Sequence, residues 1–279
     1  MGRVILSAFA DEYSAQFDEQ LAALRGFSID RIEIRGVDGK NISALTEKEV
    51  REARRKLDEY GILASAIGSP VGKVRLDADL DAHLDMAKRV FESANILGTK
   101  YVRMFSFYAP RDKVITDCRG EVFSELERLA DAAKAAGVVL CHENEAQIYG
   151  SVPERCREIV DTFGDIRTVF DMGNYVLEGV KPYEAYCALA ESIQYFHIKD
   201  ALFAGAIVPP GKGEADIQRI ISDYSRGERD FVVSLEPHLQ LFSGLNGLVG
   251  RRFDNPYKYN SQEEAFSDAV TKIKELLKI

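Results

Sequence analysis

Runs of adjacent apolar residues recur eight times along the chain, and β-branched residues are frequent in them. Apolar side chains at consecutive rather than alternating positions are typical of strands that are covered on both faces. The runs begin 27 to 39 residues apart, at Arg3, Arg31, Ile62, Thr99, Val138, Ile166, Ile193 and Phe231. We therefore predict eight buried strands.

Helical patterns lie between these runs. Thr46 and Glu49 form a T-x-x-E capping box ahead of an amphipathic segment that stops at Gly61. Apolar residues at three- and four-residue spacing predict three further helices, over 80–98, 122–137 and 265–278. Strands that alternate with helices in this way form a parallel sheet.

Eight such units within 279 residues indicate an α/β fold, a (β/α)8 TIM barrel with a parallel, eight-stranded closed sheet. An open doubly wound sheet is the alternative. It normally carries a glycine-rich fingerprint after its first strand, and residues 8–14 (AFADEYS) contain none. No linker or change of composition divides the chain, so we expect residues 1–279 to form a single TIM-barrel domain.

Four consecutive predicted strands end on polar residues. The fifth runs through VVLC into HENE and ends on Glu143, and the next three end on Asp171, His197 and Glu236. The carboxyl ends of barrel strands meet at one rim, where the chemistry of such barrels takes place. One carboxylate there can simply cap a helix or face water, but four polar residues at equivalent positions favour a shared site.

Three carboxylates brought together in a partly dehydrated pocket repel one another strongly, and a divalent cation removes that repulsion. Three oxygen ligands and one nitrogen ligand suit Mn²⁺, Mg²⁺ or Co²⁺ and are compatible with Zn²⁺. We therefore predict that Glu143, Asp171, His197 and Glu236 bind one divalent metal ion as a cofactor.

Over nearly all of its length the chain resembles the xylose isomerase-like TIM barrels, which include sugar and sugar-phosphate isomerases and epimerases and relatives of endonuclease IV. The motifs that carry the resemblance are HENE (142–145), FDMGN (170–174), FHIKD (196–200) and SLEPH (234–238). In the isomerase and epimerase branch, the glutamates that match Glu143 and Glu236 bind the metal and also move protons. The residues that match Asp171 and His197 complete the metal site.

The endonuclease branch has different metal ligands. It uses a cluster of three zinc ions, with extra histidines on strands 3 and 4 and three residues after the strand 6 aspartate. In this chain strand 3 ends AIGSP, strand 4 ends RMFSF, and the third position holds Asn174. These differences argue against an endonuclease IV-like phosphodiesterase.

The resemblance implies an isomerase or epimerase whose partner is a small polyhydroxylated substrate. One of Glu143 and Glu236 would remove a proton from the carbon beside a carbonyl and the other would return one, through a metal-stabilised enediolate. A dehydratase of a cyclic polyol or a related hydroxy-carbonyl compound is the alternative, because it uses the same site but expels a hydroxyl group.

Polar residues in or just after the predicted strands are candidates for substrate binding: Asn174, Lys199, Asp200, Arg35, Arg103 and His238. For the charged residues among them, a structural ion pair is the alternative role. The Gly-Lys-Gly turn within 208–216, ahead of a helix, is a candidate anion cradle. Residues 239–260 form a long predicted loop, either a lid or a subunit contact in a homo-oligomer.

Composition limits the partners. The chain has 36 Lys and Arg against 45 Asp and Glu, a net charge of −9, and no basic block, so we expect neither nucleic acid nor a membrane as a partner. The first apolar run is too short for a secretory signal, and no run reaches the roughly 20 apolar residues of a membrane span. We therefore expect a cytoplasmic protein. Four scattered cysteines indicate neither a disulfide framework nor a zinc cluster.

Overall fold

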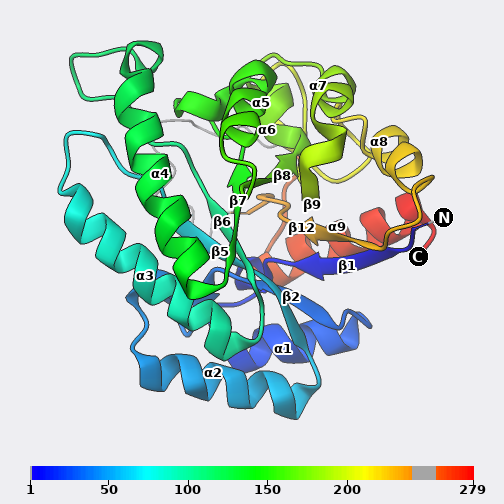
Figure 1. Ribbon diagram of the computed structural model, residues 1–279. Coiled ribbons are helices and arrows are strands. Elements are labelled where there is room, and N and C mark those ends of the chain that lie inside the picture. Colours follow the sequence, from blue (N-terminus) through cyan, green and yellow to red (C-terminus); the bar gives the residue numbers. More distant parts are fainter. Residues whose placement is uncertain (1, 241–255) are drawn as a thin grey trace.

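The computed structural model describes residues 2–240 and 256–279, and its main strands lie at the centre with helices around them (Figure 1). The strands of the central sheet are β1 (Val4–Ala8), β2 (Arg31–Ile34), β5 (Leu63–Val71), β6 (Tyr101–Met104), β7 (Val139–Glu143), β8 (Arg167–Asp171), β9 (Ile193–Ile198) and β12 (Phe231–Leu235). Each of them overlaps one of the eight predicted runs.

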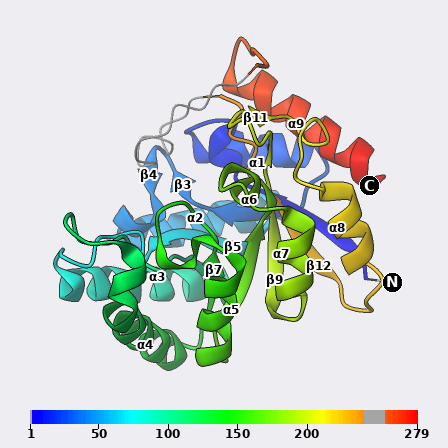
Figure 2. The same ribbon diagram turned by 90° about the horizontal axis from the view of Figure 1, so that it is seen from above.

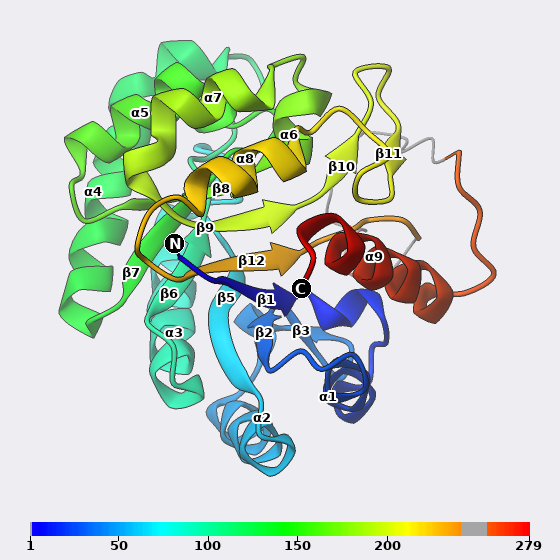
Figure 3. The same cartoon turned by 90° about the vertical axis from the view of Figure 1, so that its right-hand side faces the viewer.

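The strands pair in the order β1-β12-β9-β8-β7-β6-β5-β2, and every pairing is parallel. β1 and β2, the two ends of this order, contact each other, so the sheet forms a nearly closed barrel. β1, β12 and β9 run side by side in one direction, and the hairpin of β10 (Asp200–Ala201) and β11 (Ile207–Val208) follows the carboxyl end of β9 (Figure 3). The prediction of a (β/α)8 TIM barrel is confirmed.

At least one helix follows each strand of the barrel. The helices are α1 (Phe17–Gly26), α2 (Glu47–Tyr60), α3 (Leu80–Leu97), α4 (Arg119–Ala136), α5 (Pro153–Thr162), α6 (Met172–Leu177), α7 (Pro182–Leu189), α8 (Ile217–Tyr224) and α9 (Gln262–Leu277). α3 and α4 lie on one side of the strands and α8 and α9 on the opposite side (Figure 2). A short ribbon of β3 (Gly36–Val37) and β4 (Lys40–Asn41) follows β2.

The capping box predicted for α2 is formed. Thr46 Oγ1 accepts a hydrogen bond from the Glu49 N–H, and the Glu49 carboxylate accepts one from the Thr46 N–H at 2.8 Å. Gly61 ends the helix with a φ of +63°, a conformation that costs glycine little. Such an N-cap contributes about 1 kcal/mol to stability.

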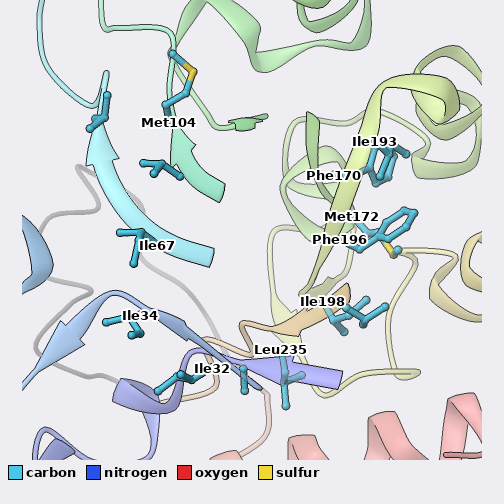
Figure 4. Close-up of a cluster of buried hydrophobic side chains, with 14 of the residues drawn as sticks. Ile32, Ile34, Ile67, Met104, Phe170, Met172, Ile193, Phe196, Ile198 and Leu235 are labelled. Atoms are coloured by element: carbon cyan, nitrogen blue, oxygen red, sulfur yellow. The ribbon is translucent and has the colours of Figure 1, made fainter. Parts of the chain in front are cut away.

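Side-chain alternation along the strands separates two apolar layers. Ile32, Ile34 and Ile198 belong to the large layer between the sheet and the helices (Figure 4). A small separate cluster fills the barrel interior: Ala66, Cys141, Val169 and Tyr195. Because successive strand residues point to opposite faces, the polar residues next to Ile32, Ile34 and Ile198 turn into the barrel.

No helix in residues 2–240 and 256–279 is long and apolar enough to cross a membrane. The predicted lid or subunit contact at 239–260 falls mostly on residues 241–255, which lie outside the described residues.

Candidate metal centre

The four predicted metal ligands converge at the carboxyl ends of β7, β8, β9 and β12. Glu143 and Asp171 are the last residues of β7 and β8, His197 pairs with Asp171 in β9, and Glu236 directly follows β12. One potential ligand atom from each residue lies within 4.8 Å of those of the other three, and all four residues are buried. The four residues therefore lie together, as expected from the strand ends, and are called the cluster here.

Asn144 fastens the end of β7 to the end of β8. Its side chain accepts a hydrogen bond from the Asp171 N–H and donates one to the Asp171 carbonyl, both at 3.0 Å. Asp171 Oδ1 accepts from the Asn174 N–H at 2.7 Å and so caps α6, which leaves Oδ2 turned toward the cluster. These contacts fix the Asp171 carboxylate relative to β7.

The His197 imidazole lies between three carboxylates. Its Nδ1 is 3.0 Å from Glu143 Oε1 and 3.5 Å from Glu236 Oε2, whereas its Nε2 is 3.0 Å from Glu33 Oε2. Burial lowers the pKa of His197, but the charges of Glu33 and Glu143 outweigh it and raise the pKa to about 10. The two ring nitrogens thus face different groups, Nδ1 the cluster and Nε2 the Glu33 carboxylate.

Lys199, two residues after His197, places its ammonium among oxygens of the cluster. Nζ donates to Asp171 Oδ2 at 2.8 Å, to Asn174 Oδ1 at 3.1 Å and to Glu236 Oε2 at 3.2 Å. Two of these three oxygens belong to predicted metal ligands. Positive charge is therefore stabilised at this position by the protein itself.

Two arginines also place positive charge beside the cluster. Arg35 Nη1 donates to Glu236 Oε1 at 2.7 Å. Arg103 Nη1 forms an ion pair with Glu143 Oε2 at 3.1 Å but directs no N–H at it. This Glu143 oxygen is buried and receives no hydrogen bond from the described residues. A buried carboxylate oxygen without a donor is costly, and an ion or substrate would satisfy it.

The Phe9 ring supports both guanidinium groups. The Cζ atoms of Arg35 and Arg103 lie 4.4 and 5.1 Å from its centroid, and the His197 ring meets it edge-to-face at 5.1 Å. Cation–π contacts shielded from water contribute about 2 kcal/mol. A Cβ on Gly68 would lie 2.3 Å from Phe9 Cε1, so only glycine leaves room for the ring.

Burial and neighbouring charges compete in setting the pKa of each carboxyl. At Glu143, burial raises the pKa, but His197 and Arg103 outweigh it and lower the pKa to about 2. At Glu236, nearby cations, with Lys199 first, likewise outweigh burial and hold the pKa well below its usual value. At Asp171 burial outweighs the charge of Lys199 and raises the pKa to about 7. Both glutamates are therefore ionised at neutral pH.

The donor set fits a divalent cation. Three carboxylates and one imidazole give oxygen-rich coordination, which suits Mn²⁺, Mg²⁺ or Co²⁺ and allows Zn²⁺. The unsatisfied oxygen of Glu143 and the ammonium held between Asp171 and Glu236 both mark places where positive charge is favoured. These four residues could hold the ion.

A second group of potential ligands, Glu12, Glu236 and His238, adjoins the first. Arg35 already fills it, with Nη2 3.2 Å from Glu12 Oε1. Burial raises the pKa of Glu12 to about 8, so this carboxyl is mostly protonated at neutral pH. Each of the two groups found in the described part of the chain contains one histidine, which differs from a histidine-rich trinuclear zinc cluster.

The other predicted substrate contacts take varied positions. Asn174 donates from Nδ2 to the Asn144 carbonyl at 2.8 Å and accepts from Lys199, so it braces the cluster. The His238 N–H donates to Glu12 Oε2 at 2.8 Å, and its Nε2 lies 4.0 Å from Glu236 Oε1. His238 therefore contacts the Glu236 side of the cluster.

Asp200 shapes the loop that follows β9. Its carboxylate accepts four backbone N–H groups, those of Ala201, Gly211, Gly213 and Ala215, at 2.8–3.1 Å. The anion that the predicted Gly-Lys-Gly cradle holds is thus the chain's own carboxylate. We therefore assign Asp200 to the folding of this loop.

Sequence analysis missed Glu33 on β2 and the acidic pair Asp11–Glu12 after β1. Arg35 donates to Asp11 and Glu12 at 2.8–3.2 Å, and Glu33 contacts His197. A signal was present, because Glu33 lies two residues before Arg35 and alternation turns both inward. The first two strand ends carry no histidine, and a histidine among carboxylates was the pattern that marked the later strand ends.

Comparison with known proteins agrees with this architecture. The family described as xylose isomerase-like TIM barrel matches residues 21–239. None of the curated proteins matches the chain at a significant level.

Solved structures with the same fold cover the chain almost end to end. An L-ribulose 3-epimerase has a TM-score of 0.73 at 19% identity and covers 100% of this chain and 95% of its own. The IOLI protein with a bound zinc atom has a TM-score of 0.71 at 21% identity, with 98% and 97% covered. The probable 3-DHS dehydratase AsbF from Bacillus anthracis has a TM-score of 0.72 at 14% identity, with 98% and 99% covered.

At these identities the solved structures establish the fold alone, while the family match spans most of the sequence and includes all four motifs in full. The chain therefore belongs to the xylose isomerase-like TIM barrel family.

Proposed function

We propose that this protein is a divalent-metal-dependent isomerase or epimerase of a sugar or sugar phosphate, and that it works by proton transfer beside a carbonyl group. The observation that carries the proposal is the placement of two ionised glutamates beside one imidazole nitrogen. Glu143 Oε1 and Glu236 Oε2 lie 3.0 and 3.5 Å from His197 Nδ1. Epimerases among the solved structures of this fold support the same reaction class.

A divalent ion held by Glu143, Asp171, His197 and Glu236 would polarise a carbonyl oxygen and stabilise the negative charge of an enediolate. Glu143 and Glu236 reach the cluster from β7 and from the end of β12, with β8 and β9 between them in the sheet. One carboxylate would take a proton from carbon, and the other would return one from a different direction. Return to the opposite face inverts the carbon, and return to the neighbouring carbon interconverts aldose and ketose.

The buried cations are the candidate substrate contacts in this proposal. The ammonium of Lys199 and the guanidinium groups of Arg35 and Arg103 carry donors beside the two glutamates. Hydroxyl and carbonyl oxygens of a polyhydroxylated substrate accept such donors, and a phosphate would do so more strongly. His238, on the Glu236 side, is placed to make a further contact.

The test is solvent-deuterium exchange in the presence of Mn²⁺ with a panel of ketoses and ketose phosphates, followed by NMR. We expect deuterium at the carbon beside the carbonyl of one substrate, without loss of water, and a fall of about 10²–10⁴-fold in Glu143→Gln and in Glu236→Gln. Glu158→Gln, which changes a carboxylate of α5 outside the cluster, is the control and should exchange normally.

Loss of water with growth of an enone absorbance would replace the isomerase by the dehydratase, a reaction that the name of one solved structure of this fold also contains. Full exchange activity in both glutamine variants would contradict the roles given to the two glutamates.

A further inference from the structure

Glu33 is a buried carboxylate inside the barrel, one layer below the four predicted ligands. Its Oε2 lies 3.0 Å from His197 Nε2, and its Oε1 accepts a hydrogen bond from the Tyr195 hydroxyl at 2.9 Å. Glu33, Tyr195 and His197 are each at most 3% exposed. Among the described residues each Glu33 oxygen therefore has one hydrogen-bond partner, and the carboxylate is shielded from bulk water.

This arrangement assigns the two nitrogens of His197. A carboxylate oxygen accepts hydrogen bonds, so Nε2 carries the proton that points at Glu33 Oε2. Nδ1 is turned the other way, 3.0 Å from Glu143 and 3.5 Å from Glu236. In the metal-free protein Nδ1 also carries a proton, directed at Glu143. An ion among the predicted ligands would displace that proton, and Nδ1 would then offer its lone pair to the ion.

The imidazole is also held against rotation. The Phe9 ring meets it edge-to-face at 5.1 Å and the Tyr195 ring at 5.5 Å, with both contacts fully buried. A 180° turn of the ring would place Nδ1 and Nε2 where Cδ2 and Cε1 now lie, and so separate Nε2 from the Glu33 carboxylate. The orientation is set by the interior of the barrel.

We propose that Glu33 is a positioning residue of the metal centre, which fixes His197 as the Nε2–H tautomer so that Nδ1 binds the divalent ion. The inference rests on the proposed function, since it concerns the metal of that same site. Partner groups of this kind orient a ligand histidine and increase its basicity, and their loss typically weakens metal binding about 10–100-fold.

Glu33→Gln tests the role because it conserves shape and removes one acceptor. Glutamine offers a single oxygen to two donors, so either Tyr195 or His197 meets an amide N–H. We expect the Kd for Mn²⁺, measured by titration calorimetry, to rise about 10–100-fold. Glu158→Gln is the matched control, since Glu158 also accepts a tyrosine hydroxyl, that of Tyr149 at 2.6 Å, outside the cluster; its Kd should equal that of the wild type.

A second readout does not depend on any variant. In Zn²⁺-loaded wild-type protein labelled with ¹⁵N-histidine, we expect His197 to show a protonated Nε2 and a metal-bound Nδ1. Coordination through Nε2, or a Glu33→Gln Kd within about threefold of the wild type, would overturn the inference while leaving the proposed function standing. Failure of the wild type to bind Mn²⁺ or Zn²⁺ would instead remove the proposed function and this role with it.

Discussion

Lys199→Met gives a sharp test of the charge balance at the cluster. Lys199 is 5% exposed. The variant keeps the length of the side chain but removes an ammonium that lies 2.8 Å from Asp171 and 3.2 Å from Glu236. Without it, two buried carboxylates lose a shared partner. Removal of one member of a buried ion pair typically costs about 3–5 kcal/mol, because the charge left behind is uncompensated.

The expected change in melting temperature follows from the size of the chain. An unfolding entropy of about 2.1 cal/mol/K per residue over 279 residues gives about 0.6 kcal/mol/K. In EDTA, Lys199→Met should therefore melt about 5–9 °C below the wild type. Lys56→Met is the control, because Lys56 pairs with the exposed Asp18 on the surface and its loss should cost less than about 1 kcal/mol, or under 2 °C.

Added Mn²⁺ should reverse part of this loss. The ion supplies the positive charge that Asp171 and Glu236 lack in Lys199→Met, so we expect its Kd for Mn²⁺ to fall at least about tenfold below the wild-type value. At one saturating Mn²⁺ concentration this adds about 1.4 kcal/mol to the stabilisation, or about 2 °C beyond the wild-type shift. Differential scanning fluorimetry with EDTA and with Mn²⁺ measures both. Equal melting temperatures of variant and wild type in EDTA, or equal shifts with Mn²⁺, would refute the reasoning.

Three other predictions concern parts of the fold that support the cluster. Burial lowers the pKa of His142 to about 4 from an ordinary 6.5, so on acidification the unfolded chain takes up the proton first and the free energy of unfolding falls. Between pH 7 and pH 5 this lowers stability by about 2 kcal/mol. His142→Gln should remove that loss from the pH dependence of chemical denaturation, and an unchanged pH dependence would contradict the prediction. Gly72→Ala places a Cβ 1.9 Å from a backbone carbonyl at a φ of +76° and should lower stability by at least about 3 kcal/mol in urea denaturation. Gly39→Ala is the control, because Gly39 has a φ of +77° but open space around it, and should cost only about 1 kcal/mol. Similar losses in the two variants would contradict the close contact at Gly72. Asp200→Asn removes acceptors from the loop 208–216 and should speed hydrogen exchange of its amides, which unchanged protection by mass spectrometry would disprove.

The barrel could be predicted from the sequence because parallel strands covered on both faces leave dense apolar runs, and all eight runs became strands. The long helices α2, α3, α4 and α9 could be predicted because apolar residues repeat at helical spacing over their 14 to 18 residues, and glycine follows the first three. The shorter helices α1, α5, α6, α7 and α8 have 6 to 10 residues, too few turns for a periodic pattern to stand out.

The candidate site was predictable only in part. Glu143, Asp171, His197 and Glu236 stand at strand ends, where a change from apolar to polar residues is visible in one dimension. Glu33 lies within a strand, and its contact with His197 spans 164 residues, so it depends on closure of the barrel. The four backbone bonds of Asp200 likewise depend on how one loop folds back, which residue types alone do not specify.

The central claim is that Glu143, Asp171, His197 and Glu236 bind one divalent ion at the mouth of the barrel. Anomalous diffraction from a crystal soaked in Mn²⁺ tests it most directly. The account predicts a single strong peak in each chain, about 2.0–2.4 Å from one atom of each of the four side chains, with His197 contributing Nδ1. A crystal at saturating Mn²⁺ with no peak there, or with its peak bound elsewhere, would contradict it.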